Sequence, residues 1–261
     1  MTTTRISLMA SILTIGMASC GSQSSPLAPD APDRSAPPAA SLAERGTAAP
    51  LDERSQQAVP FRRILCFGDS MTKGVTSRGF FERFTLTPVE GYIPKLRRLL
   101  RGEFGDSGQL FNSSIGGETT NQGLERLRIE VRSARYDLVL LLEGVVDVNN
   151  TEPGFENARA NLKEMMRVVK GEGIPVIIAT IPPLNEDGFR TRGAENVPKL
   201  NDMIREEADL EKVPLADHER AFGRNFTLQG PDGLHPNDAG YEVMAETWFD
   251  AIVDLAAELE T

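Results

Sequence analysis

The chain carries two kinds of hydrophobic pattern. Short runs of consecutive apolar residues have the length of strands that are buried on both faces of a sheet. They predict strands at residues 63–67, 109–112, 137–142, 174–181 and 213–216. Longer segments place apolar residues three and four positions apart, which is the spacing of one helix face. They predict helices at residues 91–101, 121–133, 155–170, 193–211 and 237–259.

The predicted strands and helices alternate along the chain. This order is typical of a parallel sheet with helices on both faces, so we expect an α/β fold in three layers with about five strands. Ligand sites of open parallel sheets lie at the C-terminal ends of the strands. Functional residues are therefore expected in the loops that follow Phe67, Asn112, Leu142, Ile181 and Ala216.

The N-terminal segment differs from the rest of the chain. Arg5 precedes a short apolar run that ends at Met17, and small residues then precede Cys20. This pattern is typical of a secretory signal, and the run is too short to cross about 30 Å of hydrocarbon as a helix. It also resembles a bacterial lipoprotein signal, in which the cysteine is lipidated; an ordinary cleaved signal with an incidental cysteine is the alternative. We expect residues 1–20 to direct export and Cys20 to anchor the protein in the cell envelope.

Residues 21–60 are rich in proline, alanine and serine and contain few large apolar residues. Such a segment cannot bury enough surface to offset its chain entropy, which predicts a disordered linker. The folded domain is then expected over residues 61–261.

Composition excludes several classes of protein. With 40% hydrophobic and 25% charged residues, the chain is neither disordered throughout nor a polytopic membrane protein. The net charge of −10 would repel a polyanion, so no nucleic-acid partner is expected. Two cysteines cannot form a disulfide framework, and with two histidines they leave little material for a zinc site. Cys66 lies in an apolar run and is expected to be buried.

Ser70 directly follows the first predicted strand, where a helix would begin. A serine there can be presented at the edge of the sheet beside backbone N–H groups, although a helix-capping role is the alternative. A nucleophilic serine needs a base. His235 lies three residues after Asp232, and a turn through Gly233 can bring that carboxylate to the imidazole. The other histidine, His218, is expected to be a surface or loop residue.

Two blocks of sequence, GDSMT at residues 68–72 and DGLHPNDAGY at residues 232–241, resemble the GDSL/SGNH hydrolase family. The block NSSIGGETT at residues 112–120 resembles the family's second block, and the resemblance covers essentially the whole domain. It implies a flavodoxin-like three-layer fold. It also implies that Ser70 is the nucleophile, that His235 is the general base and acid, and that Asp232 orients His235. The backbone N–H groups of Ser70 and Gly117 would line the oxyanion hole, and no cofactor would be needed.

The third block departs from the family pattern. It usually reads Gly-x-Asn-Asp, with the Asn side chain as a third oxyanion donor, but Val146 stands at that position between Gly144 and Asp147. Loss of one such donor typically lowers kcat about 10²–10³-fold. Activity could therefore be weakened, or Asn149 or Asn150 could supply a donor from the next turn; both also fit loop or capping roles.

The remaining acids have simpler interpretations. Asp69 and Asp147 each follow a strand and are expected to accept hydrogen bonds from backbone N–H groups. Glu118 is expected to be a solvated loop residue. Glu143 ends a strand and is expected to be a partly buried carboxylate that holds a loop rather than a catalytic group.

Two loops border the predicted site. Phe80, Phe81 and Phe84 make residues 75–90 apolar, either as a substrate-binding wall for an acyl chain or sugar face, or as ordinary packing. Residues 184–196 are polar and contain Arg190 and Arg192, which either meet a carboxylated substrate or are solvated.

The leading hypothesis is a lipid-anchored serine esterase that hydrolyses short acyl groups, such as acetyl, from a small molecule or a carbohydrate. Contact with a membrane would be through the anchor alone, and the sequence indicates no oligomeric state. The alternative is a catalytically impaired protein of the same fold that binds a glycan or envelope component, because Val146 replaces the oxyanion-hole Asn.

Overall fold

The computed structural model describes residues 60–77, 91–149 and 154–260. Cys20 and the rest of the predicted signal lie outside the described residues, as do Phe80, Phe81 and Phe84 and nearly all of the predicted linker. No helix within the described part of the chain is long and apolar enough to cross a membrane.

The described residues form one five-stranded parallel sheet with the order β2-β1-β3-β4-β5. The first strand therefore lies inside the sheet, and later strands are added on both sides of it. The strands are β1 (Arg63–Gly68), β2 (Gln109–Ser114), β3 (Leu138–Leu142), β4 (Val176–Ala179) and β5 (Leu215–Ala216). Every residue of β3 is buried, and all of β1 except its first residue, as their continuous apolar runs predict.

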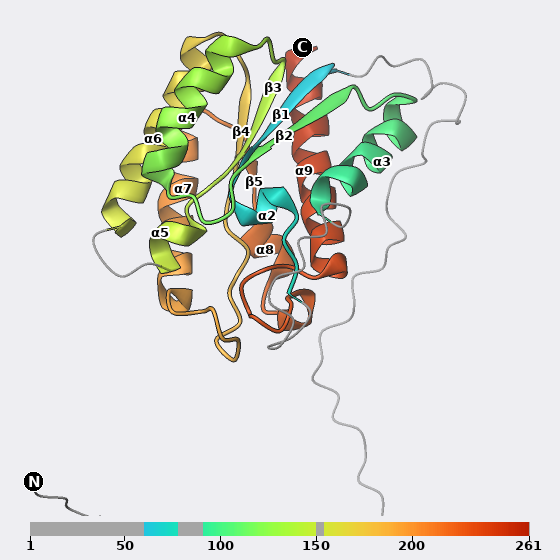
Figure 1. Ribbon diagram of the computed structural model, residues 1–261. Helices are drawn as coiled ribbons and strands as arrows, with labels where there is room; N and C mark the ends of the chain where they lie inside the picture. The colour runs from blue at the N-terminus through green and yellow to red at the C-terminus, as the bar shows by residue number, and fades with distance from the viewer. Residues whose placement is uncertain (1–59, 78–90, 150–153, 261) are drawn as a thin grey trace, which may run out of the picture. The chain divides into compact units, whose positions relative to one another are not determined.

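Helices cover both faces of the sheet (Figure 1). One layer contains α4 (Thr120–Ser133), α6 (Gly154–Gly171) and α7 (Val197–Glu211), and the other contains α3 (Tyr92–Phe104) and α9 (Asp238–Leu259). The predicted three-layer α/β fold is confirmed.

The structure also contains several short helices. They are α2 (Ser70–Lys73), α5 (Val145–Asn149), α8 (His218–Phe222) and the 3-10 helices η1 (Ala194–Asn196) and η2 (Phe226–Leu228). A helix start at Ser70 was expected, and η1 falls within the helix predicted at residues 193–211, but α5, α8 and η2 were not predicted, because one or two turns are too short to show a helical spacing of apolar residues. Three of the short helices follow strands and lie at the same end of the sheet in Figure 1.

The predicted strand at residues 174–181 was too long. The backbone N–H of Ile181 donates to Asn201 Oδ1 at 2.8 Å, and Asn201 Nδ2 donates back to the Ile181 carbonyl at 2.8 Å. The buried side-chain amide of Asn201, in α7, thus satisfies both the N–H and the carbonyl of Ile181. These groups are therefore not available to a neighbouring strand, and the chain leaves the sheet. The helix predicted at residues 91–101 corresponds to α3, which runs three residues further, to Phe104. Gly105 caps its C-terminus with a left-handed φ of 73°.

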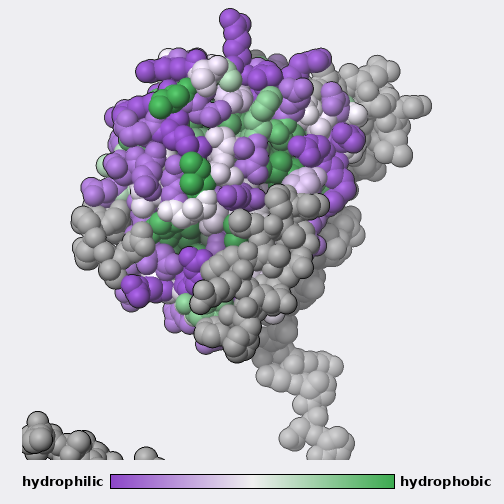
Figure 2. Space-filling model, in the orientation of Figure 1, coloured by the Kyte–Doolittle hydropathy of each residue, from purple (hydrophilic) through white to green (hydrophobic). Residues whose placement is uncertain are grey.

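The core on the α9 side is aromatic. Trp248, Tyr92 and Tyr241 are fully buried, and the rings of Tyr92 and Trp248 lie 6.1 Å apart. Cys66 is also fully buried, as predicted, and burial raises the pKa of its thiol to about 12. On the outside, the face in Figure 2 is mostly hydrophilic, with hydrophobic residues in small separate patches.

The end of β1 has no room for a side chain at Gly68. A Cβ there would overlap the carbonyl oxygen of Leu142 and the hydroxyl of Thr72. We expect Gly68→Ala to lower the free energy of unfolding by about 1–3 kcal/mol, measured by urea denaturation. Gly102→Ala is the matched control, because a Cβ there meets nothing and alanine favours the interior of α3 by about 0.5–1 kcal/mol. Equal effects of the two substitutions would contradict the close approach at Gly68.

Candidate active site

The loops after β1, β2 and β3 meet at one edge of the sheet and enclose a pocket of about 390 Å³. The strands are parallel, so their C-terminal ends necessarily share that edge. Ser70, Gly117 and Val146 come from these three loops, and His235 from the loop before α9 completes the wall. Residues from four separate parts of the chain, predicted to form a site together, therefore line one pocket.

Ser70 is the first residue of α2 and is buried. The capping role considered for Ser70 belongs to its neighbour, because Asp69 Oδ1 accepts the Met71 backbone N–H at 2.8 Å. Asp69 thus has the backbone contact predicted for it. Burial raises the pKa of Asp69 to about 7; the Met71 N–H opposes this rise, and the charges of Asp147 and Glu118 add to it.

Asp232 and His235 meet through a local turn. Gly233, with φ of 73°, lets the chain fold back so that the Leu234 and His235 N–H groups each donate to Asp232 Oδ1 at 3.0 Å. Asp232 Oδ2 lies 2.6 Å from His235 Nδ1. Burial alone would raise the pKa of Asp232, but the contacts from His235 and the two N–H groups hold it below its usual value. The carboxylate is therefore ionised and fixed in direction.

The other imidazole nitrogen, His235 Nε2, lies 2.9 Å from Ser70 Oγ. These two residues are 165 positions apart in the sequence. An imidazole that is held by a carboxylate on one side and faces a serine hydroxyl on the other can accept the hydroxyl proton. The geometry supports the chemistry that the sequence suggested for these three residues.

The helix α9 links the two ends of this arrangement. Asn237 lies two residues after His235 and caps the N-terminus of α9. Its side-chain oxygen accepts the Gly240 N–H at 3.1 Å. One turn further, the Tyr241 hydroxyl donates to the Val75 carbonyl at 2.6 Å, and the Val75 N–H donates to the Ser70 carbonyl at 3.0 Å. The same helix thus holds the loop of His235 and the segment after Ser70.

Gly117 lies in a tight turn beside Ser70. The Glu118 N–H donates to the Ile115 carbonyl at 3.3 Å, and Gly117 has φ of 83°. A positive φ at the third position is the geometry of a type II turn, which favours glycine there. A Cβ added at Gly116 would lie 3.7 Å from Ser70 Cβ, so the turn packs directly against the serine.

Val146 lines the pocket with hydrocarbon. The amide of Asn149, considered as a replacement donor, is engaged elsewhere: Nδ2 donates to the Arg190 carbonyl at 3.0 Å, and Oδ1 accepts the Gly193 N–H at 3.0 Å. Asn149 therefore fastens the loop at residues 190–193 to the end of α5. Asn150 lies outside the described residues.

The predicted polar rim is present at Arg190. The backbone N–H of Arg190 donates to the Asp232 carbonyl at 3.0 Å, which attaches the rim to the loop that contains Asp232. Arg190 also lines the pocket. Arg192 is exposed and lies outside the pocket lining. Phe189 and Ile115 are exposed apolar residues. They directly precede Arg190 and Gly116, which line the pocket.

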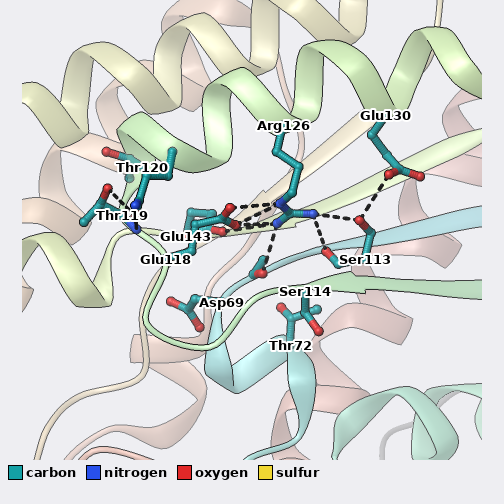
Figure 3. Close-up of polar contacts among 12 residues, drawn as sticks. Asp69, Thr72, Ser113, Ser114, Glu118, Thr119, Thr120, Arg126, Glu130 and Glu143 are labelled. Carbon is teal, nitrogen blue, oxygen red and sulfur yellow. Dashed lines mark hydrogen bonds and ion pairs between the residues drawn. The ribbon is translucent and has the colours of Figure 1, made fainter.

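The prediction that Glu118 is solvated was wrong. Glu118 is buried, and the Arg126 Nε donates to its two carboxylate oxygens at 2.9 and 3.1 Å. Figure 3 shows Arg126 reaching from α4 between Glu118 and Ser113. Sequence reasoning missed Arg126, since it occurs in an ordinary amphipathic helix pattern with no motif around it.

Glu143 and Asp147 lie close by. Asp147 accepts the Thr120 N–H at 2.9 Å and the Thr120 hydroxyl at 2.8 Å, which confirms a loop-shaping role. Glu143 is more buried than predicted, with a side chain 0% exposed. Burial, followed by the charges of Asp69 and Glu118, raises the pKa of Glu143 well above its usual value.

The prediction that His218 is a surface or loop residue was also wrong. His218 is fully buried in α8, and its ring packs against that of Trp248 in a T-shaped arrangement with the ring centroids 5.1 Å apart. Burial lowers the pKa of His218 to about 3, against the opposing charge of Asp217. The sequence could not show this, because Trp248 is 30 positions away in another helix.

No group of three or more histidine, cysteine, aspartate or glutamate side chains within residues 60–77, 91–149 and 154–260 is arranged to hold a metal ion.

Comparison with known proteins points to one family. The model of the GDSL-like lipase/acylhydrolase family matches residues 66–243, which include Ser70, Gly117, Asp232 and His235. A multidomain esterase of Ruminococcus flavefaciens is 30% identical over 231 residues, which cover 78% of this chain and 30% of that protein. This chain thus spans less than a third of that relative. An arylesterase of Vibrio mimicus is 28% identical over 193 residues, covering 70% of this chain and 84% of the relative.

The fold also resembles that of a solved carbohydrate acetylesterase from Sinorhizobium meliloti. The TM-score is 0.64 at 20% identity, and the match covers 74% of this chain and 99% of the other.

The neutral, buried His218 makes stability depend on pH. Its pKa is lower in the folded state, so below pH about 6.5 the unfolded chain takes up a proton that the folded chain refuses, and stability falls as the pH falls toward 3. Between pH 7 and pH 5 we expect wild type to lose about 2 kcal/mol more free energy of unfolding than His218→Phe, measured by urea denaturation. Identical losses in both proteins would contradict a neutral His218.

Proposed function

Because the chain belongs to the GDSL-like lipase/acylhydrolase family, we propose that it is a serine esterase that hydrolyses carboxylic esters. The observation that carries this proposal is the continuous contact from Ser70 Oγ to His235 Nε2 at 2.9 Å and from His235 Nδ1 to Asp232 Oδ2 at 2.6 Å.

In the proposed reaction, Ser70 Oγ attacks the ester carbonyl carbon while His235 Nε2 takes the hydroxyl proton. The resulting imidazolium is stabilised by the ionised Asp232. His235 then gives the proton to the alcohol oxygen as the bond to the acyl carbon breaks, which leaves an acyl group on Ser70. Water, deprotonated by the same imidazole, hydrolyses this acyl-enzyme and restores the serine. The sequence of steps needs no cofactor.

The negative charge on the carbonyl oxygen is stabilised, in this proposal, by the backbone N–H groups of Ser70 and Gly117. Their segments pack against each other at the pocket wall. Val146 offers no donor, so two donors act where the family pattern has three. One missing donor corresponds to about 3–4 kcal/mol of transition-state stabilisation.

We further propose a short acyl group, such as acetyl, on a carbohydrate or another small alcohol. The pocket of about 390 Å³ is lined near Ser70 by the apolar side chains of Val75, Val146 and Leu234, which suits a small acyl group. The name of the structural neighbour, a carbohydrate acetylesterase, supports this choice, whereas the names of the relatives, esterase and arylesterase, support ester hydrolysis in general. Export and anchoring at the envelope through Cys20 are part of the same proposal.

A second candidate function is binding without turnover, and Val146 is the observation that favours it. A protein of this kind would retain a glycan or envelope component and release no product. It would also fail to react at Ser70 with a fluorophosphonate, because that reaction needs the same activated hydroxyl and oxyanion donors. The intact contacts of Ser70, His235 and Asp232 favour the esterase.

Hydrolysis of p-nitrophenyl acetate by the full chain tests the esterase. We expect Ser70→Ala and His235→Ala each to lower kcat by at least about 10³-fold, because these residues act as one unit in the proton transfer. Circular dichroism checks that both variants are folded. Turnover that persists unchanged in both would refute the proposal, and wild-type binding of acetylated glycans without product or Ser70 labelling would favour the second candidate.

Restoring the missing donor is a sharper test of the oxyanion hole. We expect Val146→Asn to raise kcat about 10–100-fold with little change in KM, since such a donor acts mainly in the transition state. Val146→Leu is the control for side-chain size, because leucine adds volume without a donor. A lower or unchanged kcat in Val146→Asn would show that position 146 does not face the developing oxyanion.

A further inference from the structure

A buried cluster of charged side chains lies behind the turn that carries Gly117, outside the Ser70, His235 and Asp232 group (Figure 3). Its centre is Arg126, which projects from the second turn of α4. The side chain of Arg126 is 20% exposed and that of its partner Glu118 is 4% exposed. None of the steps described above uses either residue.

We propose that Arg126 is a positioning residue: it clamps the turn carrying Gly117 to the strand end that precedes Ser70, and so sets the separation of the two backbone oxyanion donors. This inference rests on the proposed esterase function and on the contacts of Arg126 with three separate segments.

The first segment is the turn itself. Glu118 follows Gly117 directly in the sequence and receives the paired contacts from Arg126 Nε at 2.9 and 3.1 Å. The Arg126 Nη2 also forms an ion pair with Glu118 Oε2. Two contacts in one plane restrict both the distance and the direction of the carboxylate. The position of Gly117 is therefore limited by the next residue along the chain.

The second and third segments are strand ends. Arg126 Nη1 donates to the Ser113 carbonyl at 3.2 Å and to its hydroxyl at 2.7 Å, at the end of β2. The guanidinium also lies over the ring of Phe67, 3.8 Å from its centroid, and Nη2 reaches the Gly68 carbonyl at 3.5 Å. Phe67 and Gly68 end β1 and stand just before Ser70. One side chain thus joins the strand that leads to Ser70 and the turn that holds Gly117.

Only arginine has the geometry for these contacts. Its planar guanidinium presents five N–H donors in a rigid fork and stacks on an aromatic ring, whereas lysine offers a compact charge on a flexible stem. A lysine at position 126 would keep the charge near Glu118 but would not reach all three segments at once.

Glu143 completes the local charge balance. Its carboxyl group lies 4.0 Å from Arg126 Nη2, and neither of its oxygens receives a hydrogen bond from any described residue. Burial and the charges of Asp69 and Glu118 favour the neutral form of Glu143, against the opposing charge of Arg126. A neutral Glu143 leaves the Arg126 charge to Glu118 and so keeps the clamp on the turn.

The absence of a side-chain donor at Val146 makes this clamp more important. With two backbone donors, the transition state depends on their mutual placement, and a shift of about 1 Å in such a site can cost about 10²-fold in rate. The ground-state ester gains little from the same two donors, so the effect is expected in kcat rather than in KM.

The test compares Arg126→Lys with Arg128→Lys in the full chain. Arg128 lies two residues further on α4 and pairs with Glu125 and Glu164, away from the pocket. We expect Arg126→Lys to lower kcat for p-nitrophenyl acetate about 10–100-fold while KM changes less than about twofold. The rate at which a fluorophosphonate labels Ser70 should fall in parallel. Arg128→Lys should match wild type in all three measurements.

Glu118→Gln tests the other half of the clamp and serves if Arg126→Lys does not fold. Glu118→Gln alone should also lower kcat with little change in KM. In the double variant with Arg126→Lys the loss should be smaller than the product of the two single losses, because both substitutions remove the same Arg126–Glu118 pair. Two results would overturn the proposed role of Arg126 while leaving the esterase proposal intact. One is a wild-type kcat in folded Arg126→Lys, and the other is a loss of kcat explained wholly by a smaller fraction of molecules that a fluorophosphonate can label at Ser70. If wild type itself shows no Ser70-dependent turnover, the esterase proposal and the clamp both fail.

Discussion

The shared edge of the parallel sheet is the constraint on which the rest of the structure depends. All strands point the same way, so the loops after β1, β2 and β3 must meet at one end. Both faces of β1 and β3 are covered, which leaves that edge as the place where polar groups can approach solvent. Ser70, Gly117 and Val146 face one pocket for this reason, although nearly 80 residues separate the first from the last. Gly68 shows how tightly the strand ends approach, because even a methyl group would overlap its neighbours.

Closure of the site depends on the last helix. The loop before α9 supplies His235, and the helix then crosses the sheet with Trp248 and Tyr241 fully buried. Burial of these large side chains fixes the helix, and the Tyr241 hydroxyl ties it to the segment after Ser70. The contact between His235 and Ser70 is therefore supported by the packing of α9, in addition to the two side chains themselves. Packing of this kind limits the rotamers that the His235 and Ser70 side chains can adopt.

Charge is arranged unusually behind the pocket. Four carboxyl groups, Asp69, Glu118, Glu143 and Asp147, lie close enough to influence one another, and Glu118 and Glu143 lie beside the Arg126 guanidinium. Burial raises the pKa of Asp69, of Glu143 and of Asp147, and the charges of neighbouring carboxylates add to this rise for Asp69 and Glu143. Glu118 alone among them has the paired contact with Arg126. One ion pair among acids that are neutral or bound to backbone N–H groups can be buried behind the turn that carries Gly117, and this ion pair joins that turn to β1 through Arg126.

The order of the main strands and helices could be predicted from the sequence, because apolar runs and helical spacing are properties of neighbouring residues. The sequence also indicated the Asp232 and His235 pair, because a turn of three residues through a glycine brings them together locally, and the family motifs pointed to Ser70, Gly117 and the departure at Val146. The family membership shown by residues 66–243 agrees with that reasoning. Four features depended on the packed structure: the burial of His218 against Trp248, the pairing of Glu118 with Arg126, the end of β4 before Ile181, whose backbone Asn201 binds, and the attachment of Asn149 to the rim. Each of these depends on which side chains from other elements surround a residue, and that environment exists only after the layers have packed.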